Sequence, residues 1–203
     1  MYLVKSPKLF NKITNSNVIW RMSPKTPDLY LTFDDGPVPE LTDEILSILR
    51  EKDVPATFFC VGDNVRKYPE TFWKIVDDGH TIGNHTYNHK NGWKTPNALY
   101  SANIKKFDNY YSTRLFRPPY GRIKPSQIRI LKKGYQIILW SLLSGDFDPG
   151  TSPGKCYNNV VNNLHNGAII VFHDNIKAAK NMRIALPKAI DYARKHNYRF
   201  RSL

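Results

Sequence analysis

The order of short apolar segments along this 203-residue chain is the feature that most constrains how it can fold. Segments with the length and composition of strands alternate with segments whose apolar residues recur at helical spacing. The expected strands cover residues 29–33, 56–60, 81–82, 115–116, 137–140 and 168–172. Repeated strand–helix units of this length predict an α/β fold with a mainly parallel sheet and helices outside it. Closure of the sheet into a barrel is compatible with this pattern, but the pattern does not require it.

The apolar spacing also predicts where the helices lie. The first helix starts near residue 41, and the second runs without interruption through 65–76. A third helix, opened by Pro96, keeps its apolar face as far as Tyr111. The last helix has Pro187 in its first turn or two and precedes a final strand near residues 198–200.

Length and composition support a single domain with one core. The chain is 41% hydrophobic, which is enough apolar material for one well-packed domain over residues 29–203. Residues 1–28 are rich in Lys, Asn, Ser and Pro, with scattered apolar residues between them. We expect them to form an N-terminal extension that packs on this domain.

The net charge is +13 and the sequence pI is about 9.7. A balance this basic favours an anionic partner, such as nucleic acid, an acidic polymer or an anionic membrane surface. The alternative is a basic enzyme surface with no specific polyanion, because net charge bears on solubility and encounter rather than on chemistry.

Cysteine use and hydropathy bear on the compartment. Cys60 and Cys156 form no CxxC pair, so a disulfide framework is not indicated and a reducing compartment is expected. The most apolar run, 137–143, is far below the roughly 20 residues that span a bilayer. With no secretory signal seen near the N-terminus, we expect a cytoplasmic protein or one peripheral at the inner membrane face.

Two adjacent carboxylates, Asp34 and Asp35, end the first predicted strand. Side by side they repel each other, unless a cation is present to favour ionisation of both. If Asp35 binds a metal ion, Asp34 is left free to act as a base. The alternative is a turn pair preceding Gly36 and Pro37, because Asp and Gly both favour turns.

His85 and His89 are separated by three residues. On a helical turn both rings would face the same side and could bind one ion, whereas the alternative is two surface or capping histidines. Two imidazoles and the carboxylate of Asp35, with open positions, are the ligand set of a hydrolytic metal site. An ion held there lowers the pKa of bound water and polarises a carbonyl group, and Asp34 can then take the proton from the attacking water.

Arg117 and His173 also follow predicted strands. Arg117 precedes two prolines that fix its direction, and its guanidinium can pair with Asp34 and keep that carboxylate ionised. His173 is placed to protonate a departing amine. Taken singly, a surface arginine beside a turn and a core histidine are the alternatives.

Four segments together resemble successive motifs of the polysaccharide deacetylase family, the NodB-homology, chitin-deacetylase-like carbohydrate esterases. They are TFDDGP at 32–37, HTYNH at 85–89, RPPYG at 117–121 and VFH at 171–173. Their order is that of the family, and the resemblance covers about residues 29–200. It implies a distorted (β/α)7-type barrel with one divalent metal, usually zinc, with cobalt, nickel or iron in some members.

The resemblance also implies roles for single residues. Asp35, His85 and His89 would be the metal ligands, Asp34 the general base and His173 the general acid. Arg117 would tune Asp34, and the backbone N–H of Tyr120 would donate to the oxyanion of the tetrahedral intermediate. Apolar faces for a sugar ring could come from the aromatic residues around the site, which are Trp93, Tyr87, Trp140, Phe147 and Tyr120. The alternative is that these rings are simply core or rim residues.

The chain departs from the family pattern in the fourth motif, which often reads Asp-x-x-Asp-Trp. Leu143 stands where the first Asp is expected, and Phe147 replaces the Trp. Asp146 remains and could support Arg117 or His173. These departures concern the tuning of the acid and the shape of the substrate wall, and they leave the metal site intact.

We therefore expect a metal-dependent hydrolase that removes N-acetyl groups, with O-acetyl groups as a variant, from amino-sugar units of a polysaccharide, peptidoglycan or glycan precursor. The expected partner is an N-acetylated glycan, with anionic and lipid-linked forms included. We expect no nucleic acid, a peripheral membrane contact at most, and a monomer. Two alternatives remain: hydrolysis of a cyclic amide on the same scaffold, and an inactive basic module that binds a polyanion.

Overall fold

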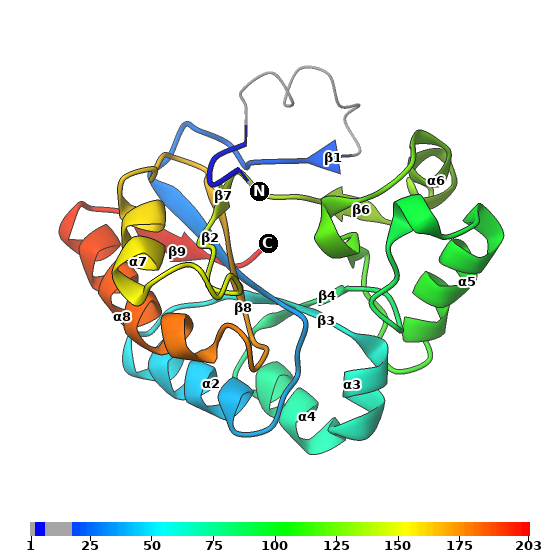
Figure 1. Ribbon diagram of the computed structural model, residues 1–203, viewed down its shortest axis with the longest axis horizontal. Helices are drawn as coiled ribbons and strands as arrows, with labels where there is room; N and C mark the ends of the chain where they lie inside the picture. The colour runs from blue at the N-terminus through cyan, green and yellow to red at the C-terminus, as the bar shows by residue number, and fades with distance from the viewer. Residues whose placement is uncertain (1–2, 7–17) are drawn as a thin grey trace.

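The computed structural model describes residues 3–6 and 18–203 (Figure 1). Within them, nine strands form one sheet, with the order β1-β6-β5-β4-β3-β2-β8-β7, and β9 pairs with β2 beside this path. The strands are β1 (Val18–Ile19), β2 (Asp28–Asp34), β3 (Thr57–Cys60), β4 (Thr81–Asn84), β5 (Leu115–Phe116), β6 (Gln136–Ile138), β7 (Leu142–Leu143), β8 (Ile169–His173) and β9 (Arg199–Arg201). All pairings between these strands are parallel. The prediction of a distorted, mainly parallel barrel is confirmed.

Helices lie around the outside of the curled sheet (Figure 1). They are α2 (Leu41–Glu51), α3 (Gly62–Lys67), α4 (Pro69–Asp77), α5 (Asn97–Phe107), α6 (Pro125–Leu131), α7 (Pro153–Val161) and α8 (Ala179–Lys195), with short turns η1 (Gly92–Lys94) and η2 (Pro119–Gly121). In α2, Leu41, Ile45 and Leu49 are buried at the predicted helical spacing. Burial of such a stripe against the sheet is what stabilises a helix of this length.

The core is centred on β2, which has neighbours along both edges. Thr32 to Asp34 pair with β3 on one side, and residues 30–34 pair with β8 on the other. The rings of Phe33 and Phe58 stack at 4.8 Å between centroids, and both side chains are buried. Because parallel strands are in register here, their carboxyl ends meet at one edge, where a barrel places its site.

Three helix predictions need correction. The helix expected through 65–76 is two helices, because Pro69 lacks the N–H that would continue α3 and instead starts α4. The third helix ends at Phe107 rather than reaching Tyr111, although the Tyr111 ring still packs on Phe72 at 5.6 Å. Pro187 lies inside α8, which begins eight residues earlier at Ala179, and not in its first turns.

Part of the N-terminal extension belongs to the sheet. Val18 and Ile19 pair with Ile137 and Ile138 of β6, and Arg21 bridges to Ala168 at the start of β8. Lys5 bridges to Leu142 in β7. The extension therefore contacts strands near both ends of the sheet, β6 at one end and β7 at the other. The domain boundary at residue 28 stays a prediction. Several of its apolar residues, in 7–17, lie outside the described residues.

Among the described residues, no helix is both long enough and apolar enough to cross a membrane. Cys60 and Cys156 are both buried free thiols, as expected from their spacing.

Candidate metal centre and active site

The predicted site residues lie at the carboxyl ends of five strands. Asp34 is the last residue of β2 and Asp35 follows it, while His85 follows β4. Arg117 follows β5, His173 is the last residue of β8, and Asp146 lies in the loop after β7. Five segments far apart in sequence thus bring their polar side chains to one edge of the sheet.

Asp35, His85 and His89 form the candidate metal centre, with one ligand atom from each lying within 4.8 Å of the others. The Oδ1 atom of Asp35 is 3.0 Å from Nε2 of His89 and 3.5 Å from Nε2 of His85. Its second oxygen, Oδ2, accepts a hydrogen bond of 2.6 Å from the side chain of Asn175. One carboxylate oxygen and two imidazole nitrogens therefore converge, and this donor set fits a divalent ion such as zinc with positions left for water and substrate.

His85 and His89 are brought together by a non-helical loop, and not by the predicted helical turn. Residues 85–90 form no helix, and both Thr86 and His89 have left-handed backbones, with φ of 63° and 52°. The side chain of Asn84 accepts from the N–H of Thr86, whose hydroxyl accepts from the N–H of Lys90. The loop is thus held in a conformation that non-glycine residues rarely adopt.

The electrostatics favour the protonation states that bind a metal. Burial lowers the pKa of His85 to about 4, so its ring is neutral at pH 7. Burial acts to raise the pKa of Asp35, but the hydrogen bond with His89 and the nearby histidines outweigh it and hold that pKa well below its usual range. A neutral imidazole and an ionised carboxylate are the forms that ligate a cation.

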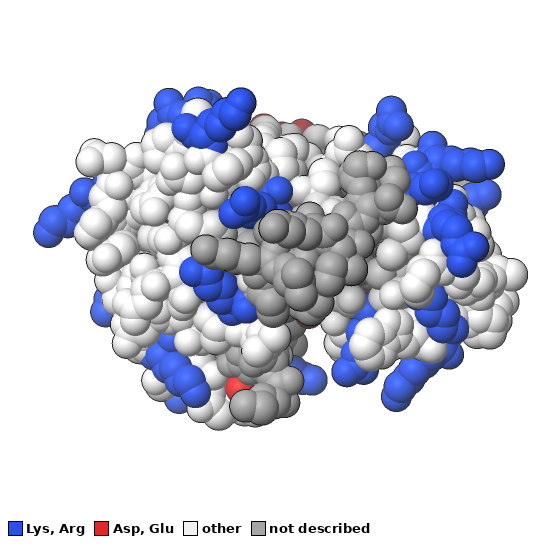
Figure 2. All heavy atoms as spheres, turned by 90° about the horizontal axis from the view of Figure 1, so that it is seen from above, with Lys and Arg blue, Asp and Glu red and all other residues white. Residues whose placement is uncertain are grey.

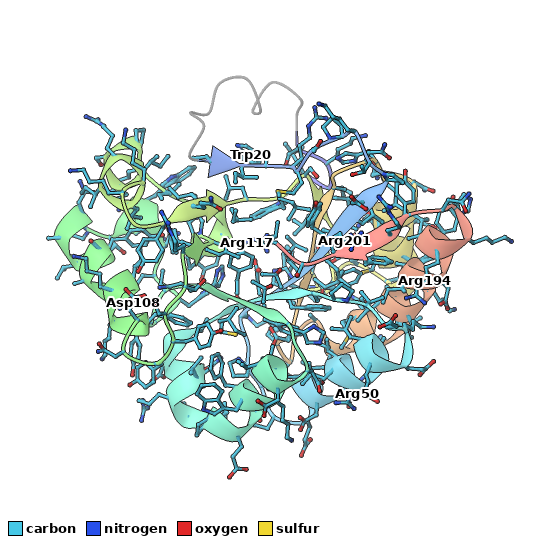
Figure 3. All side chains as sticks on the ribbon, turned by 180° about the vertical axis from the view of Figure 1, so that it is seen from behind. Trp20, Arg50, Asp108, Arg117, Arg194 and Arg201 are labelled. Atoms are coloured by element: carbon cyan, nitrogen blue, oxygen red, sulfur yellow. The ribbon has the colours of Figure 1, made fainter. Side chains whose placement is uncertain are left out.

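Asp34 pairs with Arg117 in the interior. Nη1 of Arg117 donates to Oδ1 of Asp34 at 2.6 Å and to the hydroxyl of Thr32 at 2.7 Å, and the arginine side chain is fully buried. Nε and Nη2 donate to the carbonyls of Ile138 and Leu139 at 3.3 and 3.2 Å. Figure 3 shows Arg117 among the strands at the centre of the molecule. The structure thus excludes the alternative of a surface arginine.

His173 and Asp146 form a second pair. The ring Nδ1 of His173 lies 2.7 Å from Oδ1 of Asp146, and its backbone N–H donates to Oδ2, also at 2.7 Å. Burial alone would lower the pKa of His173, but the charge and hydrogen bond of Asp146 outweigh it and raise the pKa to about 9. The edge of Phe147 packs on the same ring at 4.9 Å. Asp146 was expected to support either Arg117 or His173, and it contacts His173.

Tyr120 lies beside the metal ligands. Its ring meets that of His89 edge to face at 4.7 Å between centroids, and 60% of the residue is exposed. Its φ of 62° is left-handed. The use of its backbone N–H as an oxyanion donor stays a prediction.

Sequence reasoning missed two residues that support the centre. Asn175 orients Asp35, and Asp174, buried, accepts from the N–H of Gly36 at 2.7 Å and from the hydroxyl of Thr42 at 3.1 Å. Burial raises the pKa of Asp174 to about 7. The signal was present, because both residues directly follow His173 at the end of β8.

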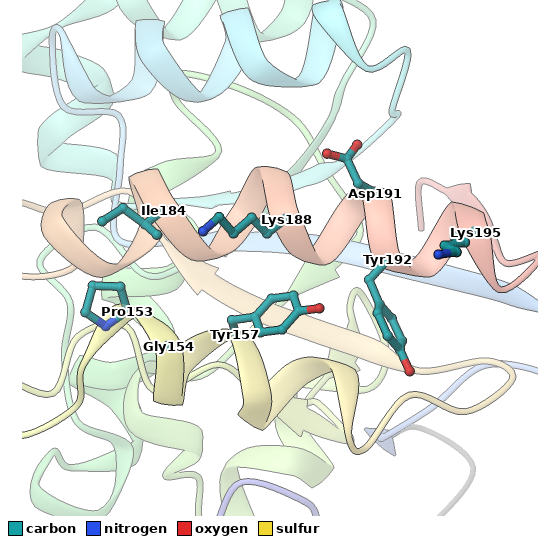
Figure 4. A pocket seen from close by; sticks show the side chains of 8 residues that line it. All are labelled: Pro153, Gly154, Tyr157, Ile184, Lys188, Asp191, Tyr192 and Lys195. Atoms are coloured by element: carbon teal, nitrogen blue, oxygen red, sulfur yellow. The ribbon is translucent and has the colours of Figure 1, made fainter.

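A surface hollow lies away from this site. It has a volume of about 570 Å³ between α7 and α8, and its lining includes Tyr157, Lys188 and Tyr192 (Figure 4). The cluster of metal-binding type that the described residues contain is at the strand ends instead. The chemistry therefore points to the strand ends and not to the hollow.

Comparisons with known proteins agree with this site. A family model described as polysaccharide deacetylase matches residues 21–137. A peptidoglycan-N-acetylglucosamine deacetylase of Bacillus cereus is 37% identical over 153 residues, which cover 72% of this chain and 55% of that protein. A second one from the same species is 34% identical over 191 residues, covering 90% of this chain and 89% of that protein. The chain thus spans little more than half of the first relative and most of the second.

A solved structure agrees along nearly the whole chain. The crystal structure of a peptidoglycan N-acetylglucosamine deacetylase, in complex with an N-oxidanyl-benzamide compound, is similar with a TM-score of 0.90 at 31% identity. The similarity covers 98% of this chain and 95% of that one.

Proposed function

Because the chain belongs to the polysaccharide deacetylase family, we propose that it is a metal-dependent hydrolase that removes N-acetyl groups from the amino sugars of peptidoglycan or of chitooligosaccharides. The observation that carries this proposal is the convergence of Asp35, His85 and His89 within 4.8 Å, beside a carboxylate paired with a buried arginine. Such a ligand set with open positions supports hydrolysis of an amide.

Each side chain of the site has a part in this reaction. Asp35, His85 and His89 would hold the ion, which when bound would supply Lewis-acid chemistry to a water molecule and to the acetyl carbonyl group. Asp34 would take the proton as the water oxygen attacks the carbonyl carbon, and Arg117 fixes the direction of Asp34 through its hydrogen bond. The backbone N–H of Tyr120 donates to the oxyanion that forms.

The second half of the reaction belongs to His173. Its pKa of about 9 keeps the imidazolium form at neutral pH, so it can give a proton to the sugar nitrogen as the carbon–nitrogen bond breaks. Acetate leaves, and the amine remains on the sugar. Asp146 fixes the ring through Nδ1, which leaves the other nitrogen, Nε2, for this transfer.

We propose zinc as the metal, because two imidazoles and one carboxylate suit it, with cobalt, nickel and iron as alternatives. The metal content of the purified protein, followed by reloading of the stripped protein with each ion, tests this choice. Recovery of acetate release with iron or nickel but not with zinc would contradict it.

A substrate panel tests the reaction itself. Acetate release is measured at saturating metal from chitooligosaccharides, peptidoglycan fragments with N-acetylglucosamine or N-acetylmuramic acid, acetylated xylan and cyclic amides. We expect turnover of the N-acetylated glycans. Turnover of cyclic amides alone would contradict the proposal and support the alternative, hydrolysis of a cyclic amide on the same scaffold. Binding of acidic polymers that vanishes in salt, with no acetate released, would support an inactive binding module.

The place of action is also a proposal. The predicted cytoplasmic or inner-membrane location implies a precursor substrate, so lipid-linked N-acetylglucosamine belongs in the same panel. A strong preference for the precursor over the polymer would support that location, and the reverse preference would contradict it.

We further propose that the chain acts as a monomer, which sedimentation of the purified protein tests.

A further inference from the structure

Three exposed side chains next to His89 form a surface that the reaction scheme above does not use. Trp93 and Tyr120 are each 60% exposed, although both are large and partly apolar. The guanidinium carbon of Arg122 lies over both rings, 5.3 Å from the centre of Trp93 and 6.0 Å from that of Tyr120. We call Trp93, Tyr120 and Arg122 the aromatic ledge.

The ledge is held in place by contacts between the two loops that carry it. The N–H of Gly92 donates to the carbonyl of Arg122 at 3.1 Å, and Nε1 of Trp93 donates to the carbonyl of Ile123 at 3.2 Å. A Cβ at Gly92 would lie 2.3 Å from that Arg122 carbonyl oxygen, so only glycine permits this approach. Exposed rings that are fixed before binding lose little conformational freedom when a ligand packs on them.

The ledge continues directly from the metal centre. The ring of Tyr120 contacts that of His89 at 4.7 Å, and Arg122 and Trp93 follow beyond it. The flat faces of aromatic rings suit the C–H face of a sugar, so a glycan bound at the metal would extend over these rings.

The charge of Arg122 is available to a ligand. Among the described residues, no carboxylate forms an ion pair with it, whereas Arg50, Arg66 and Arg183, which are also exposed, each have one. Lys90 and Lys94, both exposed, lie in the loop that carries Trp93. A planar guanidinium held over an aromatic ring matches a carboxylate by two parallel hydrogen bonds.

We propose that the aromatic ledge binds the sugar next to the one that loses its acetyl group, and that Arg122 selects glycans that carry a carboxylate there. This inference rests on the proposed function. In peptidoglycan such a carboxylate belongs either to the lactyl group of muramic acid or to the attached peptide.

The test compares three tetrasaccharides: neutral N-acetylated chitotetraose, an alternating N-acetylglucosamine–N-acetylmuramic acid chain with free lactyl carboxylates, and the same chain with attached peptides. The kcat/KM for acetate release is measured for the wild type and for Arg122→Gln. We expect the preference for the carboxylated over the neutral chain to fall about fivefold, mainly through KM. The tetrasaccharide on which Arg122→Gln lowers kcat/KM identifies the source of the carboxylate, either the lactyl group or the attached peptide.

The matched control is Arg129→Gln, which removes an exposed positive charge of α6 but leaves in place the guanidinium of Arg122 over the two rings. A preference unchanged in Arg122→Gln, or reduced equally in both variants, would overturn the proposal. If the wild type released no acetate from any chain, the proposed function would fail. Calorimetric binding of the same three chains would then still decide whether Arg122 recognises the carboxylate.

Discussion

Asp34 and Asp35 are neighbours in the chain, yet the fold gives them different partners. Asp34 accepts from the buried Arg117, while Asp35 faces His85 and His89. The left-handed backbone of Asp35, with φ of 86°, turns the two side chains apart. Two adjacent carboxylates can therefore act as a base and a metal ligand, because each faces its own set of partners.

The first prediction separates these roles. Asp34→Asn keeps the shape of the side chain but cannot accept a proton, so we expect kcat to fall by about 10²-fold to 10⁴-fold with metal content unchanged. His89→Ala removes a ligand and is expected to lose both metal and activity. Acetate release and metal analysis on the same samples measure both effects. Near-normal turnover by Asp34→Asn would mean that another group is the base.

The second prediction concerns the acid. Since His173 must be protonated to act, activity is expected to fall as pH rises through its pKa of about 9. Asp146→Asn removes the negative charge that raises this pKa, so the fall should move to lower pH. The measurement is kcat/KM against pH at saturating metal.

Asp148→Asn is the matched control, because Asp148 lies in the same loop but bonds to the N–H of Gly150. An alkaline limb at the same pH in both variants would contradict the role of Asp146.

At the scale of elements, the loops that follow β2 and β8 are locked together. Gly36 donates its N–H to the buried Asp174, and Asn175 reaches across to Asp35. The site is therefore as rigid as the pairing of these two strands, which share five residue pairs from Tyr30 to Asp34. Supporting contacts of this kind orient ligands and maintain their geometry.

The third prediction tests this contact. A Cβ at Gly36 would lie 1.7 Å from Oδ2 of Asp174, so Gly36→Ala forces the two loops apart. We expect a loss of about 1–3 kcal/mol in the free energy of unfolding, measured in urea. Gly154→Ala is the matched control, because a Cβ there meets nothing within 4 Å and α7 gains a better helix former. Equal stability of the two variants would show that the loops adjust freely.

At the scale of the whole molecule, the excess of Lys and Arg over Asp and Glu is spread widely over the surface. Figure 2 shows one face on which Lys and Arg greatly outnumber Asp and Glu, with a gathering on the side of α5 and α6. Arg129 in α6, and Lys132 and Lys133 directly after it, are all exposed. Such a field speeds the encounter with anionic glycans, and salt screens it.

The fourth prediction concerns the edge strand that the N-terminal segment adds to the sheet. Val18, 7% exposed, packs with Ile137 in a core cluster at the edge of the sheet. A chain beginning at residue 29 loses this strand, whereas one beginning at residue 18 keeps it. We expect the shorter chain to be less stable by about 2 kcal/mol or more, from the lost burial. Equal urea midpoints would support a domain boundary at residue 28.

Much of this architecture could be predicted because it depends on patterns within short segments of the sequence. Short apolar runs predict β2 to β6, β8 and β9 but not β1 or β7, and the spacing of Leu41, Ile45 and Leu49 predicts the helix α2. The break at Pro69 has a local signal, the proline itself, but the apolar stripe continues across it from α3 into α4. Pro187 shows the opposite case: tertiary packing of α8 tolerates a residue that disfavours a helix interior.

The sequence by itself determined the ligand types, their order and their position after strands, because motif chemistry and strand periodicity are local properties. Only the tertiary structure decided which groups meet. Arg117 reaches Asp34 across 83 residues, and Asp146 contacts His173 rather than Arg117. The left-handed turn at Thr86 and His89, the place of β1 at the sheet edge and the aromatic ledge also depend on it. These features arise from packing between distant segments, which no local pattern encodes.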